Sequence, residues 1–272
     1  MTSEEDSGVM AIRKALRQVS KHEKEDRFLT RRSEDYQVME EVFDKPTLML
    51  LYSMMNSGIF THLNGVVSTG KESRVYWGVN NEGKDVAVKI SLMVSADFKK
   101  RMLYIAGDPR FRTAKGWSHR LVELWAQKEF RNLNTAFENG VRVPKPITVR
   151  RNVLVMEFMG EKGKAWPLLT ESRVTKSDYK KIIAMVKKLY KRAKLVHADL
   201  SEFNIFKGRE LVIFDMGSSV DVRHPLSRQF LTRDLTNVNR FFSKNKIQTV
   251  PLDDLVREIV GDELSPVSSS FN

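Results

Sequence analysis

The chain has 272 residues, with 46 Lys and Arg against 34 Asp and Glu, a formal net charge of +12 and a pI of about 9.8. This length suffices for one two-lobed domain with a sizeable core, and the positive charge favours a polyanionic partner. Because the chain has no cysteine, no bilayer-length apolar run and an acidic start, we expect a cytoplasmic protein without disulfides, thiolate metal sites, membrane spans or a signal peptide.

Both ends of the chain differ from its centre. Residues 1–45 are expected to form a helical extension, because four apolar residues recur there at helical spacing: Val9, Ile12, Leu16 and Val19. This extension can pack on the rest of the chain or dock a partner, and both interpretations stay open. Residues 261–272 contain several serines and are expected to be disordered.

Residues 66–79 predict two strands joined by a turn of small residues, which can lay backbone N–H groups over phosphates. Part of this segment also matches a Walker loop, but Glu72 stands where Ser or Thr should bind magnesium. A strand pattern follows, whereas a Walker loop must open a helix. We therefore expect a hairpin that covers a nucleotide, with these contact residues: Val67, Ser68, Thr69, Gly70, Lys71, Glu72, Ser73 and Val75.

Residues 85–90 alternate as a strand, with Val86, Val88 and Ile90 on one face and Ala87 and Lys89 on the other. A lysine beside a small alanine leaves room for a flat ring and puts an ammonium near its phosphates. The alternative is a lysine that is merely solvated.

Residues 91–118 form a basic and aromatic stretch that Gly107-Asp108-Pro109 interrupts. It is either a solvated insertion or a loop that touches RNA or a protein. The residues concerned are Lys99, Lys100, Arg101, Arg110, Arg112, Lys115, Phe98, Tyr104, Phe111 and Trp117.

Residues 117–138 predict a helix closed by Gly140, and Glu129 falls within its apolar stripe of Val122, Trp125, Leu133 and Ala136. A carboxylate there is costly unless a cation meets it, which makes Lys89 its expected partner. The alternative is a glutamate that reaches solvent at the edge of the stripe.

Residues 152–160 predict a buried strand that runs into a linker. The order of the surrounding motifs suggests that an adenine ring binds here, against Met156, Glu157, Phe158 and Met159. Backbone groups of Glu157 and Met159 are its expected hydrogen-bond partners.

Residues 196–217 carry the strongest functional signal. Their apolar runs predict short buried strands that place Asp199, Asn204 and Asp215 at strand ends, facing one cleft. Phosphoryl transfer needs one Asp to orient and deprotonate a hydroxyl, and an Asn and a second Asp as oxygen ligands for magnesium. In the alternative, these residues only form turns.

Asp234 lies on a helix expected over residues 226–242, within the stripe of Phe230, Leu231, Leu235, Val238 and Phe241. It should therefore be buried and accept hydrogen bonds from the loop that holds Asp199. The alternative is an Asp at the stripe edge that pairs with Arg233 or Arg240.

The motifs STGKES, VAVKI, KEFRNL, LVHADLSEFN and FDMG, with the RHP that follows, resemble the RIO family of atypical serine/threonine kinases, in particular an archaeal member of its first type. The resemblance covers about residues 47–246. It implies an α/β (α+β), two-lobed protein-kinase-like fold with a truncated C-lobe. The kinase domain would span residues 46–260, with an N-lobe over 60–156 and a C-lobe over 160–260.

The resemblance also implies function: ATP as substrate, magnesium or manganese as metal, and serine phosphorylation of itself or another protein alongside ATPase activity. Asp199 would be the base, Lys89 would contact the α,β-phosphates, Glu129 would orient that lysine, and Asn204 and Asp215 would hold the metal. Ser201 stands where other kinases hold the transferred phosphoryl group with a lysine.

For this family we further expect an aspartyl phosphate on Asp215, autophosphorylation, with Ser95 as one candidate, and a role in maturation of the small ribosomal subunit, its rRNA and proteins. Two rivals remain. One is a nucleotide-gated binding factor for the pre-ribosome with little substrate kinase activity. The other is a small-molecule kinase such as an aminoglycoside phosphotransferase, whose pocket normally needs a larger C-lobe.

Overall fold

The computed structural model describes residues 43–92, 98–111 and 120–261. The chain divides into two units, residues 1–49 and 50–272, and the architecture below is that of the second. α3 (Lys45–Asn56) is the first described helix. The apolar positions expected to form an N-terminal helix, and the serine-containing tail, lie outside the described residues. Within the described ranges, no helix is both long and apolar enough to cross a bilayer.

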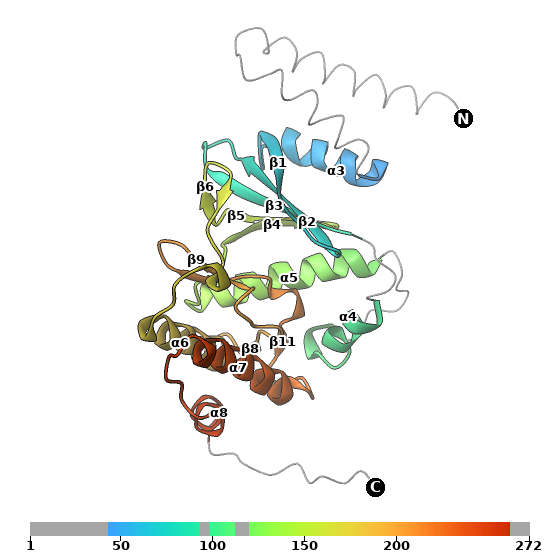
Figure 1. The fold of residues 1–272 in the computed structure, drawn as a ribbon. Coiled ribbons are helices and arrows are strands. Elements are labelled where there is room, and N and C mark those ends of the chain that lie inside the picture. The colour runs from blue at the N-terminus through green and yellow to red at the C-terminus, as the bar shows by residue number, and fades with distance from the viewer. Residues whose placement is uncertain (1–42, 93–97, 112–119, 262–272) are drawn as a thin grey trace, which may run out of the picture. The chain divides into compact units, whose positions relative to one another are not determined.

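Five antiparallel strands form the N-terminal sheet, in the order β1-β2-β3-β5-β4 (Figure 1). Their bounds are β1 (His62–Thr69), β2 (Ser73–Val79), β3 (Asp85–Ser91), β4 (Pro146–Arg150) and β5 (Val153–Glu157). α5 (Arg120–Glu138) packs against β3, β4 and β5. β3 is buried on both faces of the sheet from Val86 to Ser91. Ala87 and Lys89 are therefore buried like the apolar residues of the same strand.

The C-terminal part combines helices with two-stranded pairs. The helices are α6 (Lys176–Lys191), α7 (Ser227–Lys244) and α8 (Leu252–Val260). The strand pairs are β6 (Gly160–Glu161) with β7 (Lys164–Ala165), β9 (Ile205–Lys207) with β10 (Leu211–Ile213), and β8 (Leu195–Val196) with β11 (Val220–Asp221). Thr175 caps α6: its hydroxyl accepts from the Asp178 N–H at 3.2 Å, while Asp178 accepts from the Thr175 N–H at 2.8 Å.

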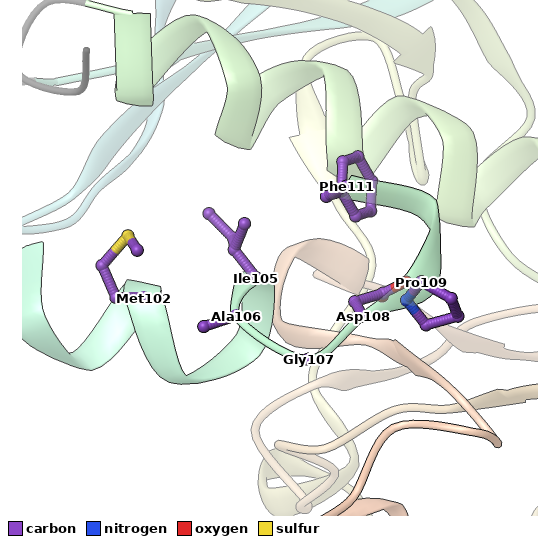
Figure 2. Close-up of a pocket in the computed structure, with 7 residues that line it drawn as sticks. All are labelled: Met102, Ile105, Ala106, Gly107, Asp108, Pro109 and Phe111. Carbon is purple, nitrogen blue, oxygen red and sulfur yellow. The ribbon is translucent and has the colours of Figure 1, made fainter. Parts of the chain in front are cut away.

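The insertion between β3 and α5 contains α4 (Phe98–Ile105) and a 3-10 turn (Pro109–Phe111), separated as expected at Gly107. The insertion borders a pocket with a volume of about 400 Å³. Figure 2 shows Met102, Ile105 and Phe111 among the residues that line it. Tyr104 packs on Phe230 with ring centroids 5.3 Å apart, and Phe111 is buried. These two aromatic residues therefore serve packing rather than RNA contact. Ser95, Arg112, Lys115 and Trp117, and the side chains of residues 98–101, lie outside the described part.

Candidate active site

Asp199, Asn204 and Asp215 meet at one end of the β9–β10 hairpin. The Asn204 side-chain amide donates to the Asp199 carbonyl at 2.6 Å, and the Phe214 N–H donates to the Asn204 carbonyl at 3.0 Å. Asp215 follows directly in a left-handed conformation, with φ of 61°. This conformation is uncommon for a non-glycine residue and is typical of functional loops. β8 pairs with β11 rather than with this hairpin, a pairing that the sequence pattern did not predict.

Lys89 joins both lobes of the site. Its ammonium donates to Glu129 Oε1 at 2.7 Å and to Asp215 Oδ1 at 2.8 Å. The Glu129 side chain is 1% exposed, whereas the Asp215 side chain is 46% exposed. The expected Lys89–Glu129 ion pair is therefore present, and the alternative of a solvated glutamate is wrong. The contact with Asp215 adds a second carboxylate partner for Lys89, which we had not expected.

The charges around Lys89 decide its protonation. Burial favours the neutral amine, but the carboxylates of Asp215 and Glu129 outweigh it and raise the pKa of Lys89 well above its ordinary value. Burial also raises the pKa of Glu129, against the opposing effect of Lys89. The pair thus depends on a permanently charged lysine, which is the form that binds phosphate oxygens.

Asp199 lies at the solvent-exposed side of the same cleft. Desolvation by the surrounding cleft raises the pKa of its carboxyl, and the negative charges of Asp215 and Glu72 raise it further. Glu72 belongs to the turn between β1 and β2, so this turn contributes to the electrostatics around Asp199. A carboxylate with a raised pKa is a stronger base, as proton abstraction from a hydroxyl requires. Ser201, two residues on, is half-buried, and its carbonyl accepts from the Asn204 N–H at 3.1 Å.

β1 and β2 form a hairpin, as expected for the segment predicted to cover a nucleotide. β2 follows the turn as a strand, so the Walker-loop alternative is wrong. At the turn, the Gly70 N–H donates to the Ser73 carbonyl at 2.9 Å. Strand register places Val75 opposite Lys89, and Ala87 opposite Met156, so these four residues share one face of the sheet. Ser68 and Thr69 at the end of β1 and Gly70 and Lys71 of the turn are exposed, while Val67, Glu72 and Ser73 are half-buried.

Hydrogen bonds made by the linker residues reduce the number of backbone groups that remain for an adenine ring. The Glu157 N–H donates to the Lys145 carbonyl, and the Met159 carbonyl accepts from the Trp166 N–H, both at 2.8 Å. The groups left to the adenine hypothesis are the Glu157 carbonyl and the Met159 N–H. The Glu157 carboxylate instead pairs with Arg142 at 2.9 Å. Phe158 between them is buried.

Asp234 anchors the loop that holds Asp199. Its carboxylate accepts from the Ala198 N–H at 2.8 Å and from the Leu200 N–H at 2.9 Å, and the residue is 1% exposed. Arg233 donates to the Ala198 carbonyl instead of pairing with this carboxylate. The anchoring interpretation is therefore confirmed. Ala198, held at φ of 65°, is a strained position that such an anchor can maintain.

Asp234 predicts a pH dependence of stability. Burial raises its pKa from 3.8 to about 7, against the two backbone hydrogen bonds. Because the folded protein then holds a proton that the unfolded chain releases, this group's stabilising contribution is complete below pH 4 and declines as the pH rises to about 7, by at most about 1.4 kcal/mol per pH unit. Asp234→Asn should remove this component and cost about 1–3 kcal/mol, because its amide cannot accept both N–H groups.

Urea unfolding of both proteins at several pH values measures these effects. Asn237→Ala removes a hydrogen bond to the Leu200 carbonyl and one from Arg240 but leaves the Asp234 carboxylate in place. It is the matched control on the same helix and should retain the pH dependence. An Asp234→Asn variant with unchanged stability would remove this residue from the anchor.

A buried polar network, absent from our expectations, holds the turn after Asp215. Lys128 donates to the Gly217 carbonyl at 2.9 Å and also to the Ser219 carbonyl. Asn132, one helical turn on, donates to the Met216 carbonyl at 2.8 Å and to the Ser219 carbonyl at 2.9 Å. Both side chains are completely buried. Lys128 and Asn132 are four residues apart and so lie on the same inner side of α5. This spacing was the sequence signal that could have identified them.

The same network reaches the insertion. Arg110 donates to Asn132 Oδ1 at 2.8 Å and forms an ion pair with Asp108 at 2.6 Å. Asp108 also accepts, at 3.4 Å, from the Asp221 N–H of β11. Burial and the charge of Arg110 lower the pKa of Lys128 to about 7. The insertion is thus connected through α5 to the backbone that carries Asp215.

Together, the sheet, the buried pair of Lys89 on β3 with Glu129 on α5, and the loop with two Asp and one Asn define a protein-kinase-like fold and site. The family model for the RIO domain matches residues 74–255. The chain is 40% identical over 253 residues to the RIO-type serine/threonine-protein kinase Rio1 of Methanocaldococcus jannaschii, covering 92% of this chain and 84% of that one. It is 35% identical over 254 residues to the serine/threonine-protein kinase rio1 of Dictyostelium discoideum, covering 90% of this chain but 44% of that protein.

Among solved structures, the Rio2 kinase–ADP/Mg²⁺–phosphoaspartate complex from Chaetomium thermophilum matches with a TM-score of 0.59 at 25% identity, covering 78% of this chain and 66% of that one. The chain belongs to the RIO family of serine/threonine protein kinases.

Proposed function

We propose that this protein is a magnesium- and ATP-dependent serine kinase and ATPase. The observation that carries the proposal is the position of Lys89, within hydrogen-bond distance of both Glu129 and Asp215, at a cleft that also holds Asp199 and Asn204. This set supplies a cation for phosphates, oxygen ligands for a metal and a base. The names of the relatives and the ADP/Mg²⁺ complex of the Chaetomium protein support it.

In this proposal each residue has one task. Lys89, oriented by Glu129, contacts the α,β-phosphates, while the β1–β2 turn covers them. Asn204 and Asp215 hold magnesium, or manganese in its place, and the metal when bound neutralises charge on the phosphates. Asp199 accepts the proton of an attacking serine hydroxyl, and Ser201 lies beside the transferred group.

Asp215 is also the proposed acceptor in the ATPase reaction. A carboxylate oxygen of Asp215 would bond to the γ-phosphorus as the bond to the ADP oxygen breaks, and water would later release phosphate. The phosphoaspartate in the Chaetomium Rio2 complex supports this step. Mass spectrometry after incubation with magnesium ATP tests it: acid-labile phosphate on Asp215 supports the step, whereas phosphate only on serine supports a kinase without it.

The proposed setting is maturation of the small ribosomal subunit, with its precursor rRNA and proteins as partners. The net charge of +12 supports a polyanionic partner. A nucleotide-gated factor with few turnovers is the second candidate. Within the described residues, the helices that follow Asp215 are α7 and α8, and these two helices offer little surface to hold an extended peptide. This favours the second candidate.

Replacing Asn132 tests the network behind Asp215. Asn132→Ala should raise the magnesium concentration needed for activity and lower stability by about 1–3 kcal/mol, because two buried carbonyls lose a donor. Asn134→Ala on the same helix removes only an exposed hydrogen bond to Glu138 and serves as the control. Magnesium titration well below the melting temperature separates the two effects. An Asn132→Ala variant with the magnesium requirement of the control would show that the network does not position Asp215.

A further inference from the structure

Positive charge is concentrated on one helix of the C-terminal part. Residues 173–194 contain nine Lys and Arg and a single acidic residue, Asp178, so this segment carries +8 of the formal net charge of +12. Eight of the cations are exposed. The seven that lie on α6 or directly after it define what we call the α6 basic face: Lys176, Lys180, Lys181, Lys188, Lys191, Arg192 and Lys194.

The α6 basic face is not neutralised within the described part of the chain. Asp178 is buried, caps the helix and pairs with Lys207 at 2.6 Å. Lys187, at the edge of the face, pairs with Glu258. None of the seven residues forms an ion pair with another described side chain. Their charge is therefore available to a partner.

Several of these charges work against helix stability. Lys176 and Lys180, and Lys188 and Arg192, stand four residues apart, where like charges repel. Lys176 lies in the first turn, where the helix dipole disfavours a cation, whereas Lys188 and Lys191 lie in the last turn, where it favours them. Lysines chosen only for solubility would normally alternate with glutamates at such positions. The conflict indicates that the charge is kept for binding.

Geometry suits a phosphate backbone. α6 spans 16 residues, about 24 Å, and its opposite side is fixed in the core through Tyr179, Ile182, Ile183, Val186 and Leu189. Its main packing partners are β8, β10 and α8, so the basic face belongs to the C-terminal part and not to the five-stranded sheet (Figure 1). None of the exposed large apolar residues of the described part lies on α6, which offers neither stacking for bases nor insertion into lipid.

We propose that the α6 basic face docks the phosphate backbone of structured RNA, without reading its sequence. Point charges on lysines position a backbone but do not distinguish bases. The choice of RNA among polyanions rests on the proposed role in ribosomal subunit maturation. The surface itself is independent of the nucleotide site.

The test compares two triple variants of equal charge. Lys180→Gln, Lys181→Gln and Lys191→Gln remove charge from the α6 basic face, and Lys84→Gln, Lys162→Gln and Lys164→Gln remove the same charge from exposed positions outside α6. Fluorescence anisotropy with a labelled RNA duplex of arbitrary sequence is recorded over a salt series. The α6 variant should weaken binding about tenfold or more at low salt and reduce the slope of log K against log salt by about two to three. The control should change both values little.

Equal losses in both variants would show that net charge, not α6, binds RNA, and an unchanged slope in the α6 variant would exclude this surface. Binding to phosphatidylserine vesicles that depends on α6, without RNA binding, would also overturn the proposal. ATP hydrolysis should be unchanged in both variants. Loss of hydrolysis in the Lys89 variants discussed below bears on the catalytic proposal alone.

Discussion

Lys89→Ala is expected to lower single-turnover ATP hydrolysis by roughly 100- to 1000-fold, because a preorganised cation is removed from the phosphates. The variant should also be less stable by about 3 kcal/mol, because Glu129 remains buried without its partner. Hydrolysis is measured by rapid quench, and folding by circular dichroism and urea unfolding. The protein should stay folded, because Glu129 can take up a proton.

A double variant separates catalysis from stability. Lys89→Met combined with Glu129→Leu replaces both charges by apolar side chains of similar length, which should restore much of the lost stability. It should not restore hydrolysis, since neither residue can then bind or orient phosphate. A folded Lys89→Ala protein that hydrolyses ATP at nearly the wild-type rate would refute the role assigned to this lysine.

Asp215→Asn is expected to abolish most magnesium-dependent turnover, because the site loses a charged metal ligand and the proposed phosphate acceptor at once. The fold should be retained, since Lys89 keeps Glu129 and the Asp215 side chain is half-exposed. Magnesium titration of activity measures the effect, together with mass spectrometry for the acid-labile phosphate. Asp215→Asn with the wild-type magnesium dependence would exclude Asp215 as a ligand.

Asn204 supplies the matched comparison. Its amide nitrogen donates to the Asp199 carbonyl, which would leave its oxygen for the proposed metal. Asn204→Asp keeps an oxygen ligand but loses this donor, whereas Asn204→Ala loses both. We therefore expect a graded rise in the magnesium requirement, with Asn204→Ala the higher. Equal requirements in the two variants would show that Asn204 acts only through the loop.

The features predicted best from sequence are those in which a local pattern and a strong physical demand coincide. Glu129 and Asp234 each sit inside an apolar helical stripe, and a buried carboxylate must find donors, so the partner could be inferred from the few candidates at hand. The β1–β2 hairpin was equally accessible, because alternation after Gly70 excludes a helix.

Other features depend on tertiary contacts that no local pattern encodes. Lys128 looks like a surface lysine until the carbonyls of residues 217 and 219 are brought to it by the fold. The contact between Lys89 and Asp215 spans 126 residues. β8 and β11 have two residues each, too few for any periodicity, so their pairing could not be read from the sequence.

The connection from Arg110 through Asn132 to the Met216 carbonyl has a consequence for protein engineering. The segment between β3 and α5 looks like a dispensable loop that could be shortened to obtain a smaller, better-behaved enzyme. Removing it would take away the guanidinium of Arg110, which donates to Asn132, and the carboxylate of Asp108. Lys128 and Asn132 would remain buried in the interior. A minimal version of this protein should therefore retain residues 102–111, and trimming is better directed elsewhere in the chain.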